Sequence, residues 1–156
     1  STNLIYSALM FIGGASASVA GGLKVNTFAV IAIGIFATLK GRENTRVFNR
    51  ELSPIQVNRA MVIGAVSLAF VLLVILILTI TEPETKLSDI IFETTSAFGT
   101  VGLSKGITSQ MSSIGHILLI ITMLIGKLGP LTIGISMAQN TRTALYRYPQ
   151  ERVTIG

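Results

Sequence analysis

The 156-residue sequence contains no cysteine and no tryptophan, and its histidine count is one. The absence of cysteine excludes disulfides, zinc–thiolate sites and cysteine redox chemistry. Charge is also scarce, because Asp, Glu, Lys and Arg make up 12% of the residues, against about 25% in a typical soluble domain. Half of the residues are hydrophobic and the mean hydropathy is +0.71. The sequence therefore predicts an integral membrane chain.

Catalytic and nucleotide-binding motifs are missing as well. No Ser–His pair, carboxylate dyad or metal-binding cluster falls at membrane depth, and His116 lies near the outer end of an apolar stretch. A phosphate-binding loop needs Gly-Lys followed by Ser or Thr, whereas Lys24 stands between Leu23 and Val25. We therefore predict that the chain is not an enzyme and has no cofactor of its own.

The few charges are separated by sign along the chain. Basic residues gather in 40–59 and 141–156, and acidic residues in 82–93. This separation follows the positive-inside rule, so we expect 40–59 and the tail in the cytoplasm and "TEPETK" outside. The net charge of +5 is thus explained by topology, with membrane lipid and not nucleic acid as the partner.

Two long apolar stretches predict membrane spans. Residues 60–80 carry no charge, and at about 1.5 Å per residue they cross a hydrocarbon core of about 30 Å. Residues 114–138 predict a second span, interrupted by the motif "GKLGP".

Between these spans, residues 87–98 predict a helix of half their length. Ser88 is a candidate N-cap, and Asp89 favours the positive end of a helix. A helix of about 12 residues covers about 18 Å, roughly half of a bilayer. Since both spans place 81–113 on the outer side, this segment must enter the membrane and return. We expect a re-entrant hairpin, with "FGTVGLS" as its ascending part.

Residues 1–39 predict a membrane helix that is broken in its middle. The apolar runs "LIYSALMFI" and "VNTFAVIAIGIFATL" flank "GGASASVAGGLK". Irregular backbone at membrane depth is tolerated where it is buried in protein or lines a wet cavity, and broken helices mark transport sites. The chain starts almost inside an apolar run, so we expect further residues upstream.

The stretch "SAFGTV" can supply backbone carbonyls to a dehydrated monovalent cation. Gly99 is free to take backbone angles that are closed to other residues. The helix before it would point its partly negative C-terminal end at the membrane centre, which favours a cation. The alternative is that these small residues only permit tight helix packing. The predicted ion-binding backbone comprises Ser96, Ala97, Phe98, Gly99, Thr100 and Val101.

Two charged residues at membrane depth are further candidates. Lys127 lies about midway along its span, where a charge costs about 2.5–3.5 kcal/mol on insertion scales; the alternative is that its side chain snorkels to an interface. Glu93 lies on the half-length helix, and either supports the hairpin by hydrogen bonding or pairs with an outer charge.

Three separated motifs resemble the Trk/Ktr/HKT superfamily of potassium-translocating membrane proteins. "FETTSAFGTVGLS" followed by "GKLGPLT" resembles the superfamily's pore sequence, and "MFIGGASASVAGGLKVNTFAV" resembles the gate-loop region of its third repeat. The tail "YRYPQERVTIG" is similar to the end of KtrB-type subunits. The resemblance covers nearly the whole chain.

The resemblance implies an all-α membrane protein with four covalently linked M1–P–M2 repeats around one pore. Residues 1–39 would be the broken M2 helix of repeat three, and residues 60–140 would be repeat four. Within repeat four, M1 would be 60–80, the pore helix 88–97, the filter 96–101 with Gly99 as filter glycine, and M2 114–138. Filters one to three lie outside this sequence, so the chain cannot close a pore alone.

The resemblance also implies an intramembrane gate loop at 13–24, below the filter. Lys127 would face this loop, at a place where the superfamily usually has arginine; lysine keeps the charge and loses the planar fork. The predicted gate residues are Gly13, Gly14, Ala15, Ser16, Ala17, Ser18, Val19, Ala20, Gly21, Gly22, Lys24 and Lys127.

The implied function is potassium uptake across a bacterial plasma membrane, with sodium as a candidate coupling ion. The implied partners are repeats one to three, a second copy in a homodimer, and a cytoplasmic nucleotide-binding ring of the KtrA type. Two alternatives stay open: a homotetrameric two-span cation channel, and a membrane scaffold subunit that does not conduct.

Overall fold

The computed structural model describes residues 2–15, 18, 20–41, 46–47 and 50–138. Within these residues the elements are almost all α-helices, which confirms the predicted all-α class. The helices are α1 (Thr2–Phe11), α2 (Val25–Leu39), α3 (Pro54–Thr81), α4 (Leu87–Gly99) and α5 (Ser113–Ala138). A 3-10 helix, η1 (Thr108–Gln110), and a hairpin of two short antiparallel strands, β1 (Arg46–Val47) and β2 (Arg50–Glu51), complete the described fold.

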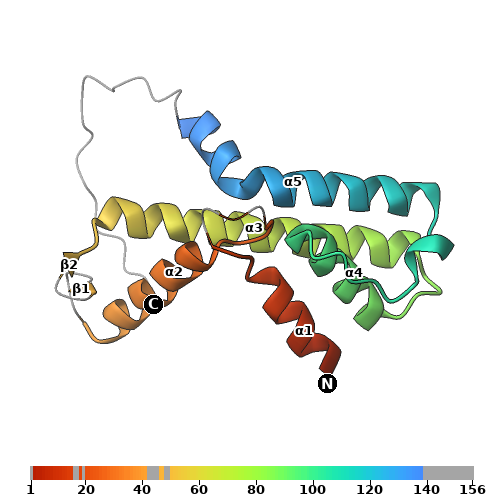
Figure 1. Cartoon of the computed structure of the whole chain (residues 1–156), viewed down its shortest axis with the longest axis horizontal. Coiled ribbons are helices and arrows are strands. Elements are labelled where there is room, and N and C mark those ends of the chain that lie inside the picture. Colours follow the sequence, from red (N-terminus) through yellow and green to blue (C-terminus); the bar gives the residue numbers. More distant parts are fainter. Residues whose placement is uncertain (1, 16–17, 19, 42–45, 48–49, 139–156) are drawn as a thin grey trace.

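Helix α3 is the long element against which α2, α4 and α5 pack (Figure 1). Pro54 stands in its first turn, where backbone N–H groups have no acceptor within the helix, so the missing N–H of proline costs no hydrogen bond. The helix begins before the predicted span 60–80 and includes Arg59, because an α-helix does not have to stop at the membrane boundary. Within the described residues α3 is long and apolar enough to cross a membrane, whereas α2 and Ser113–Gly129 are shorter apolar helices.

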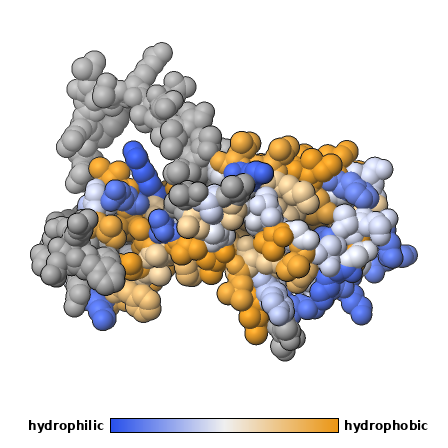
Figure 2. All heavy atoms as spheres, in the orientation of Figure 1, coloured by the Kyte–Doolittle hydropathy of each residue, from blue (hydrophilic) through white to orange (hydrophobic). Residues whose placement is uncertain are grey.

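Much of the apolar surface of α3 faces outward. Leu76 and Ile80 are 61% and 71% exposed. Figure 2 shows apolar side chains over the middle of the molecule, with hydrophilic ones gathered at the end where α3, α4 and α5 are connected. Soluble monomers rarely expose apolar surface on this scale, so this face requires lipid or further protein against it.

The segment between α3 and α5 leaves and returns at the same end of the molecule. Glu82 follows α3, and its carboxylate accepts hydrogen bonds from the backbone N–H and the hydroxyl of Ser112, at 2.9 and 2.5 Å. Ser112 directly precedes α5. Helix α4 packs against α3, and residues 100–112 bring the chain back to the start of α5. We call residues 100–107 the return segment.

The start of α4 differs from the predicted N-cap. The helix begins at Leu87, its N-cap residue is Lys86, and no side chain caps it. Ser88 lies inside the first turn, and its hydroxyl donates to the Asp89 carboxylate at 3.2 Å. The prediction of a Ser88 cap was wrong, because the helix already begins at Leu87, which places Ser88 inside the first turn and not at the N-cap.

Helices α1 and α2 are separated where the sequence predicted a break. Helix α1 packs against α4, and α2 packs along the N-terminal half of α3. Glycines let α2 and α3 approach closely, since a Cβ on Gly34 would lie 2.7 Å from Val57 Cγ1. A Cβ on Gly64 would lie 2.6 Å from the Ile31 Cδ1 atom.

Helix α5 is kinked, as the motif "GKLGP" predicted. Gly129 has φ 75° and ψ 141°, which interrupts the helical backbone. Glycine takes this left-handed φ without steric cost, and Pro130 cannot donate a backbone hydrogen bond. The described core joins α3, α4 and α5 and contains Val74, Leu78, Ile90, Ala97, Met111 and Leu119.

The hydrogen bonds between Glu82, which follows α3, and Ser112, which precedes α5, predict that the fold is less stable in acid. Hydrogen bonds from the hydroxyl and then the backbone N–H of Ser112 hold the pKa of Glu82 below its ordinary value, and His116 adds to this. Such a carboxylate stabilises the fold above its ordinary pKa and loses that contribution as pH falls through the lower, folded value. Below about pH 5, the Tm of the unaltered protein should fall further than that of Glu82→Gln.

The measurement is thermal unfolding in detergent across a pH series. Glu84→Gln removes an exposed carboxylate two residues along the chain and should keep the acid response of the unaltered protein. An equally steep acid response in Glu82→Gln would show that this tie does not contribute to stability.

Candidate functional site

Three segments that are distant in sequence meet at the C-terminal end of α4. The backbone N–H of Gly21 donates to the Thr100 hydroxyl at 3.0 Å. The backbone N–H of Gly22 donates to the carbonyl of Gly126 in α5 at 3.2 Å. The structure thus brings the predicted loop, the predicted filter segment and the middle of α5 together.

Glycines make this meeting possible by allowing backbone to touch backbone. A Cβ on Gly126 would overlap the Phe98 carbonyl oxygen, and a Cβ on Gly99 would lie 2.5 Å from the Met10 carbonyl oxygen. The approach of Gly22 to Gly99 is less tight, because a Cβ on Gly22 would lie 3.3 Å from the Gly99 Cα. We call Gly22, Gly99 and Gly126 the glycine junction.

The backbone of the predicted filter segment differs from the expectation. Helix α4 continues to Gly99, so Ser96, Ala97, Phe98 and Gly99 are helical instead of extended. The Ser96 and Ala97 carbonyls accept hydrogen bonds from Val101 and Thr100 N–H, at 3.0 and 3.1 Å. Tertiary contacts keep this turn helical, because all four of its residues are buried.

Unusual backbone angles fall after Gly99, not on it. Thr100 has φ 51° and caps α4 in the left-handed conformation, and Gly102 has φ 82°. The glycine at position 99 is needed for close approach, whereas the glycine at 102 is needed for its angle. Residues 100–104 are therefore the non-helical part of the predicted pore sequence.

The return segment is fastened to α4 by side chains. The Ser96 hydroxyl donates to the Leu103 carbonyl at 2.5 Å. Glu93 is buried, and its carboxylate accepts hydrogen bonds from the hydroxyls of Ser104 and Thr108 and from Lys105 N–H. Of the two roles open for Glu93, hydrogen bonding within the hairpin is the one the geometry matches. Sequence reasoning missed Ser104 and Thr108, whose only signal is their hydroxyls after the glycine-spaced run.

The loop between α1 and α2 is closed on itself. Gly13 N–H donates to the Leu23 carbonyl at 2.7 Å, and Leu23 N–H donates to the Phe11 carbonyl at 3.2 Å. The Lys24 ammonium donates to the Ala20 carbonyl and, at 3.4 Å, to the Ser18 carbonyl. Of the predicted gate residues, Ser16, Ala17 and Val19 lie outside the described residues.

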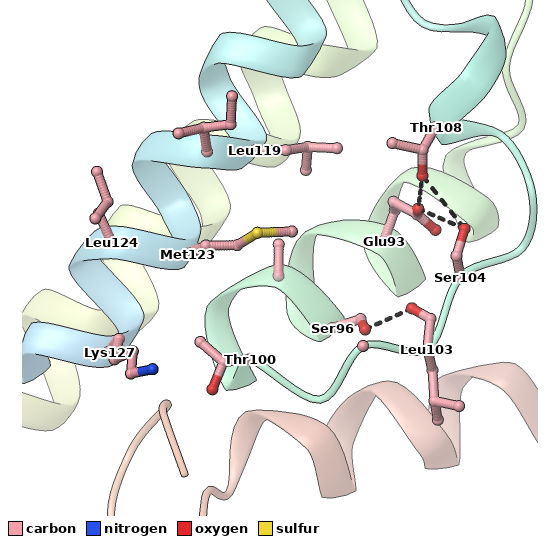
Figure 3. A pocket seen from close by; sticks show the side chains of 13 residues that line it. Glu93, Ser96, Thr100, Leu103, Ser104, Thr108, Leu119, Met123, Leu124 and Lys127 are labelled. Carbon is pink, nitrogen blue, oxygen red and sulfur yellow. Dashed lines mark hydrogen bonds between the residues drawn. The ribbon is translucent and has the colours of Figure 1, made fainter. Parts of the chain in front are cut away.

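A cavity of about 500 Å³ lies between α4, the return segment and α5 (Figure 3). Lys127 lines it and points toward the end of α4, where Thr100 lies. Within the described residues, the lysine whose ammonium binds loop carbonyls is Lys24 and not Lys127. The lining residues include Glu93, Ser96, Thr100, Gly102, Met123 and Lys127.

The glycine junction predicts a severe effect for a single methyl group. Gly126→Ala places its Cβ against the Phe98 backbone, which cannot move aside, so α5 must shift from α4. We expect a loss of about 2 kcal/mol or more in stability, a typical cost of overpacking. Chemical unfolding in detergent measures it.

Gly64→Ala is the matched control. Its Cβ would meet the far end of the flexible Ile31 side chain, which can rotate, so the loss should be clearly smaller. Equal unfolding free energies for the two variants would refute the constraint at Gly126.

Comparisons with known proteins identify the family to which the chain belongs. The family model described as TrkH, a cation transport protein, matches residues 1–144. The chain is 42% identical to the Ktr system potassium uptake protein D of Bacillus subtilis, over 100% of this chain and 34% of that protein. It is 42% identical to the Ktr system potassium uptake protein B of the same organism, over 95% of this chain and 33% of that protein.

A third relative is the potassium/sodium uptake protein NtpJ of Enterococcus hirae, 39% identical over 95% of this chain and 34% of that protein. The chain thus spans about a third of the length of these relatives. Because the family model covers almost the whole chain and the relatives match along it, the chain belongs to the TrkH family of cation transport proteins.

Proposed function

We propose that this chain forms one pore hairpin and one gate loop of a potassium uptake protein in a bacterial plasma membrane. The observation that carries the proposal is the meeting of a half-length helix, a glycine-rich loop and a cavity that contains Lys127. In this proposal α3, α4 with the return segment, and α5 are an M1–P–M2 repeat. Helices α1 and α2 are the broken M2 helix of the preceding repeat.

The hairpin supplies the chemistry that a potassium ion needs when it sheds water. The C-terminal end of α4 carries a partial negative charge, and the backbone after it turns away from helical hydrogen bonding at Thr100. Carbonyls at this level, within the predicted stretch 96–101 and on to Ser104, are candidates to replace the hydration shell. The other sides of the pore would come from repeats one to three. The names of the Bacillus relatives support potassium as the ion.

The loop between α1 and α2 is the proposed gate. It lies against the end of α4, so an ion that leaves the hairpin meets it next. Lys127 adds a positive charge beside this point, which raises the barrier for a cation while the gate is shut. The loop stays in place through Gly21 and Gly22, whose N–H groups bind Thr100 and Gly126.

The wider assembly is also a proposal. The segment 40–59 and the C-terminal tail lie in the cytoplasm because they are basic. The apolar outer faces contact lipid, further repeats of the same pore, or a second copy in a homodimer. A cytoplasmic nucleotide-binding ring of the KtrA type regulates the gate. Potassium is the transported ligand and sodium is the candidate coupling ion. In this proposal the chain has no cofactor of its own.

Two glycines of the return segment allow a matched test of the pore. Gly102 and Gly106 have φ 82° and 80°, and a Cβ on either would meet no atom within 4 Å. Alanine therefore introduces a similar strain of about 1–2 kcal/mol at both positions. Gly102 lines the cavity, whereas Gly106 is not among its lining residues.

Gly102→Ala should lower the ratio of potassium to sodium uptake several-fold, because it distorts the carbonyls at the cavity. Gly106→Ala should keep the ratio of the unaltered protein. Uptake of both ions in cells without other potassium systems, at matched protein levels, gives the answer. If both variants keep the original ratio, the return segment does not line the pathway.

The gate is tested at Thr100. Thr100→Val keeps the side-chain shape and removes the oxygen that accepts the Gly21 N–H, so the loop should open more readily and potassium flux should rise. Thr100→Ser keeps the acceptor and should conduct like the unaltered protein. Flux is measured in proteoliposomes that contain the intact transporter. A Thr100→Val protein that assembles and conducts no faster would show that the loop is not an obstruction.

A further inference from the structure

Glu93 is a buried carboxylate whose partners all come from one segment. Its side chain extends from α4 and the residue is 5% exposed. Oε1 accepts hydrogen bonds from the Ser104 hydroxyl, at 2.7 Å, and from the Thr108 hydroxyl. Oε2 accepts the backbone N–H of Lys105 at 3.2 Å. Both oxygens therefore bind the return segment or the turn that follows it, and Figure 3 shows the contacts with Ser104 and Thr108.

These contacts hold Glu93 without a counter-charge. The ion pair that the described residues contain joins Lys105 to Asp89, and Glu93 is not part of it. An ionised carboxylate in a buried place is costly unless hydrogen bonds satisfy it. The three donors can satisfy Glu93 in one arrangement of the segment, so any displacement of 104–108 leaves a buried charge short of partners. The carboxylate thus enforces the position of the backbone.

The residues just before Ser104 are also hydrogen-bonded to α4. Val101 N–H donates to the Ser96 carbonyl, and the Ser96 hydroxyl donates to the Leu103 carbonyl. Ser96 and Glu93 are three residues apart, so they lie on the same face of α4. Residues 101–104 are therefore held between two anchors on consecutive turns of one helix.

Ser104 connects the two ends of this arrangement. Its hydroxyl donates to Glu93 and accepts the backbone N–H of Gly106 at 2.9 Å, and it lies 3.2 Å from the Thr108 hydroxyl. The hydroxyl network reaches from the buried carboxylate to the outer turn η1. A change at Glu93 is thus transmitted to the backbone that carries the carbonyls of 101–104.

We propose that Glu93 is a positioning residue that sets ion selectivity by holding the return segment from behind. This inference rests on the proposed function, since it assumes that residues 101–104 face the ion. Glu93 does not contact the ion in this role. Its charge fixes the spacing of the carbonyls, and selectivity between potassium and sodium depends on that spacing.

Glu93→Gln in the intact transporter is the first test. Glutamine keeps the length of the side chain but replaces one accepting oxygen with an amide that donates, so at least one of the three contacts is lost. The ratio of potassium to sodium uptake should fall about tenfold, the order of effect of one hydrogen bond to a charged group. The KM for potassium should rise more than the maximal rate falls.

Asp89→Asn is the matched control, on the same helix and toward the same segment. Asp89 pairs with Lys105 at 3.6 Å, with side chains that are 23% and 29% exposed. Partly exposed ion pairs contribute little, so this variant should keep the original selectivity. Equal losses of selectivity in Asp89→Asn and Glu93→Gln would overturn the proposal, because any weakening of the hairpin would then suffice.

Ser104→Ala separates positioning from simple attraction of cations. It leaves the carboxylate intact and removes one of its donors, so a positioning role predicts reduced selectivity, whereas electrostatic attraction predicts none. This variant also keeps the test decisive if Glu93→Gln fails to fold. Unchanged selectivity in Ser104→Ala at a normal protein level overturns the proposal.

Trypsin cleavage after Lys105 gives a readout that does not depend on transport. If Glu93 holds the segment, Glu93→Gln and Ser104→Ala should be cut there faster than the unaltered protein and Asp89→Asn. Faster cleavage with no potassium uptake by the unaltered protein would refute the proposed function and keep the positioning role. Cleavage at an unchanged rate in both variants refutes the positioning role itself.

Discussion

The contact between the Phe98 carbonyl and Gly126 constrains the rest of the structure. It fixes how far α4 can descend beside α5, and therefore where the chain must turn back. The Gly126 carbonyl also accepts the Gly22 N–H, and the Thr100 hydroxyl accepts the Gly21 N–H. The loop between α1 and α2 therefore contacts both α5 and the end of α4. The missing Cβ atoms of Gly126 and Gly99 allow these segments to pack closely.

This crowding leaves polar backbone groups inside an otherwise apolar molecule, and the hairpin satisfies them internally. Water is not available to pair such groups at membrane depth, so protein oxygens and N–H groups must do so. Glu93 and Ser96 serve the return segment, and the Thr100 hydroxyl serves Gly21. Much of the exposed surface of α3 is apolar by contrast. The polar backbone groups of the return segment are therefore paired within the hairpin.

Sequence alone predicted features that depend on length and local composition. The span at 60–80, the half-length helix after it, the break after Phe11 and the kink near Gly129 all follow from apolar run length and glycine placement. Features that depend on contacts between distant residues were missed. Gly99 serves close packing to Met10 and not a special angle, and α4 stays helical to that residue. No local sequence pattern predicts that Ser104 and Thr108 bind Glu93.

The two lysines of the site act in different ways because their surroundings differ. Lys24 binds the carbonyls of Ala20 and Ser18 in its own loop. Lys127 lines the cavity, so the positive charge of its ammonium acts on any ion that enters the cavity. The described loop is then joined to the hairpin and α5 through the N–H groups of Gly21 and Gly22. The contacts of Gly21 with Thr100 and of Gly22 with Gly126 are made by backbone N–H groups, so they do not depend on the side chains of the loop.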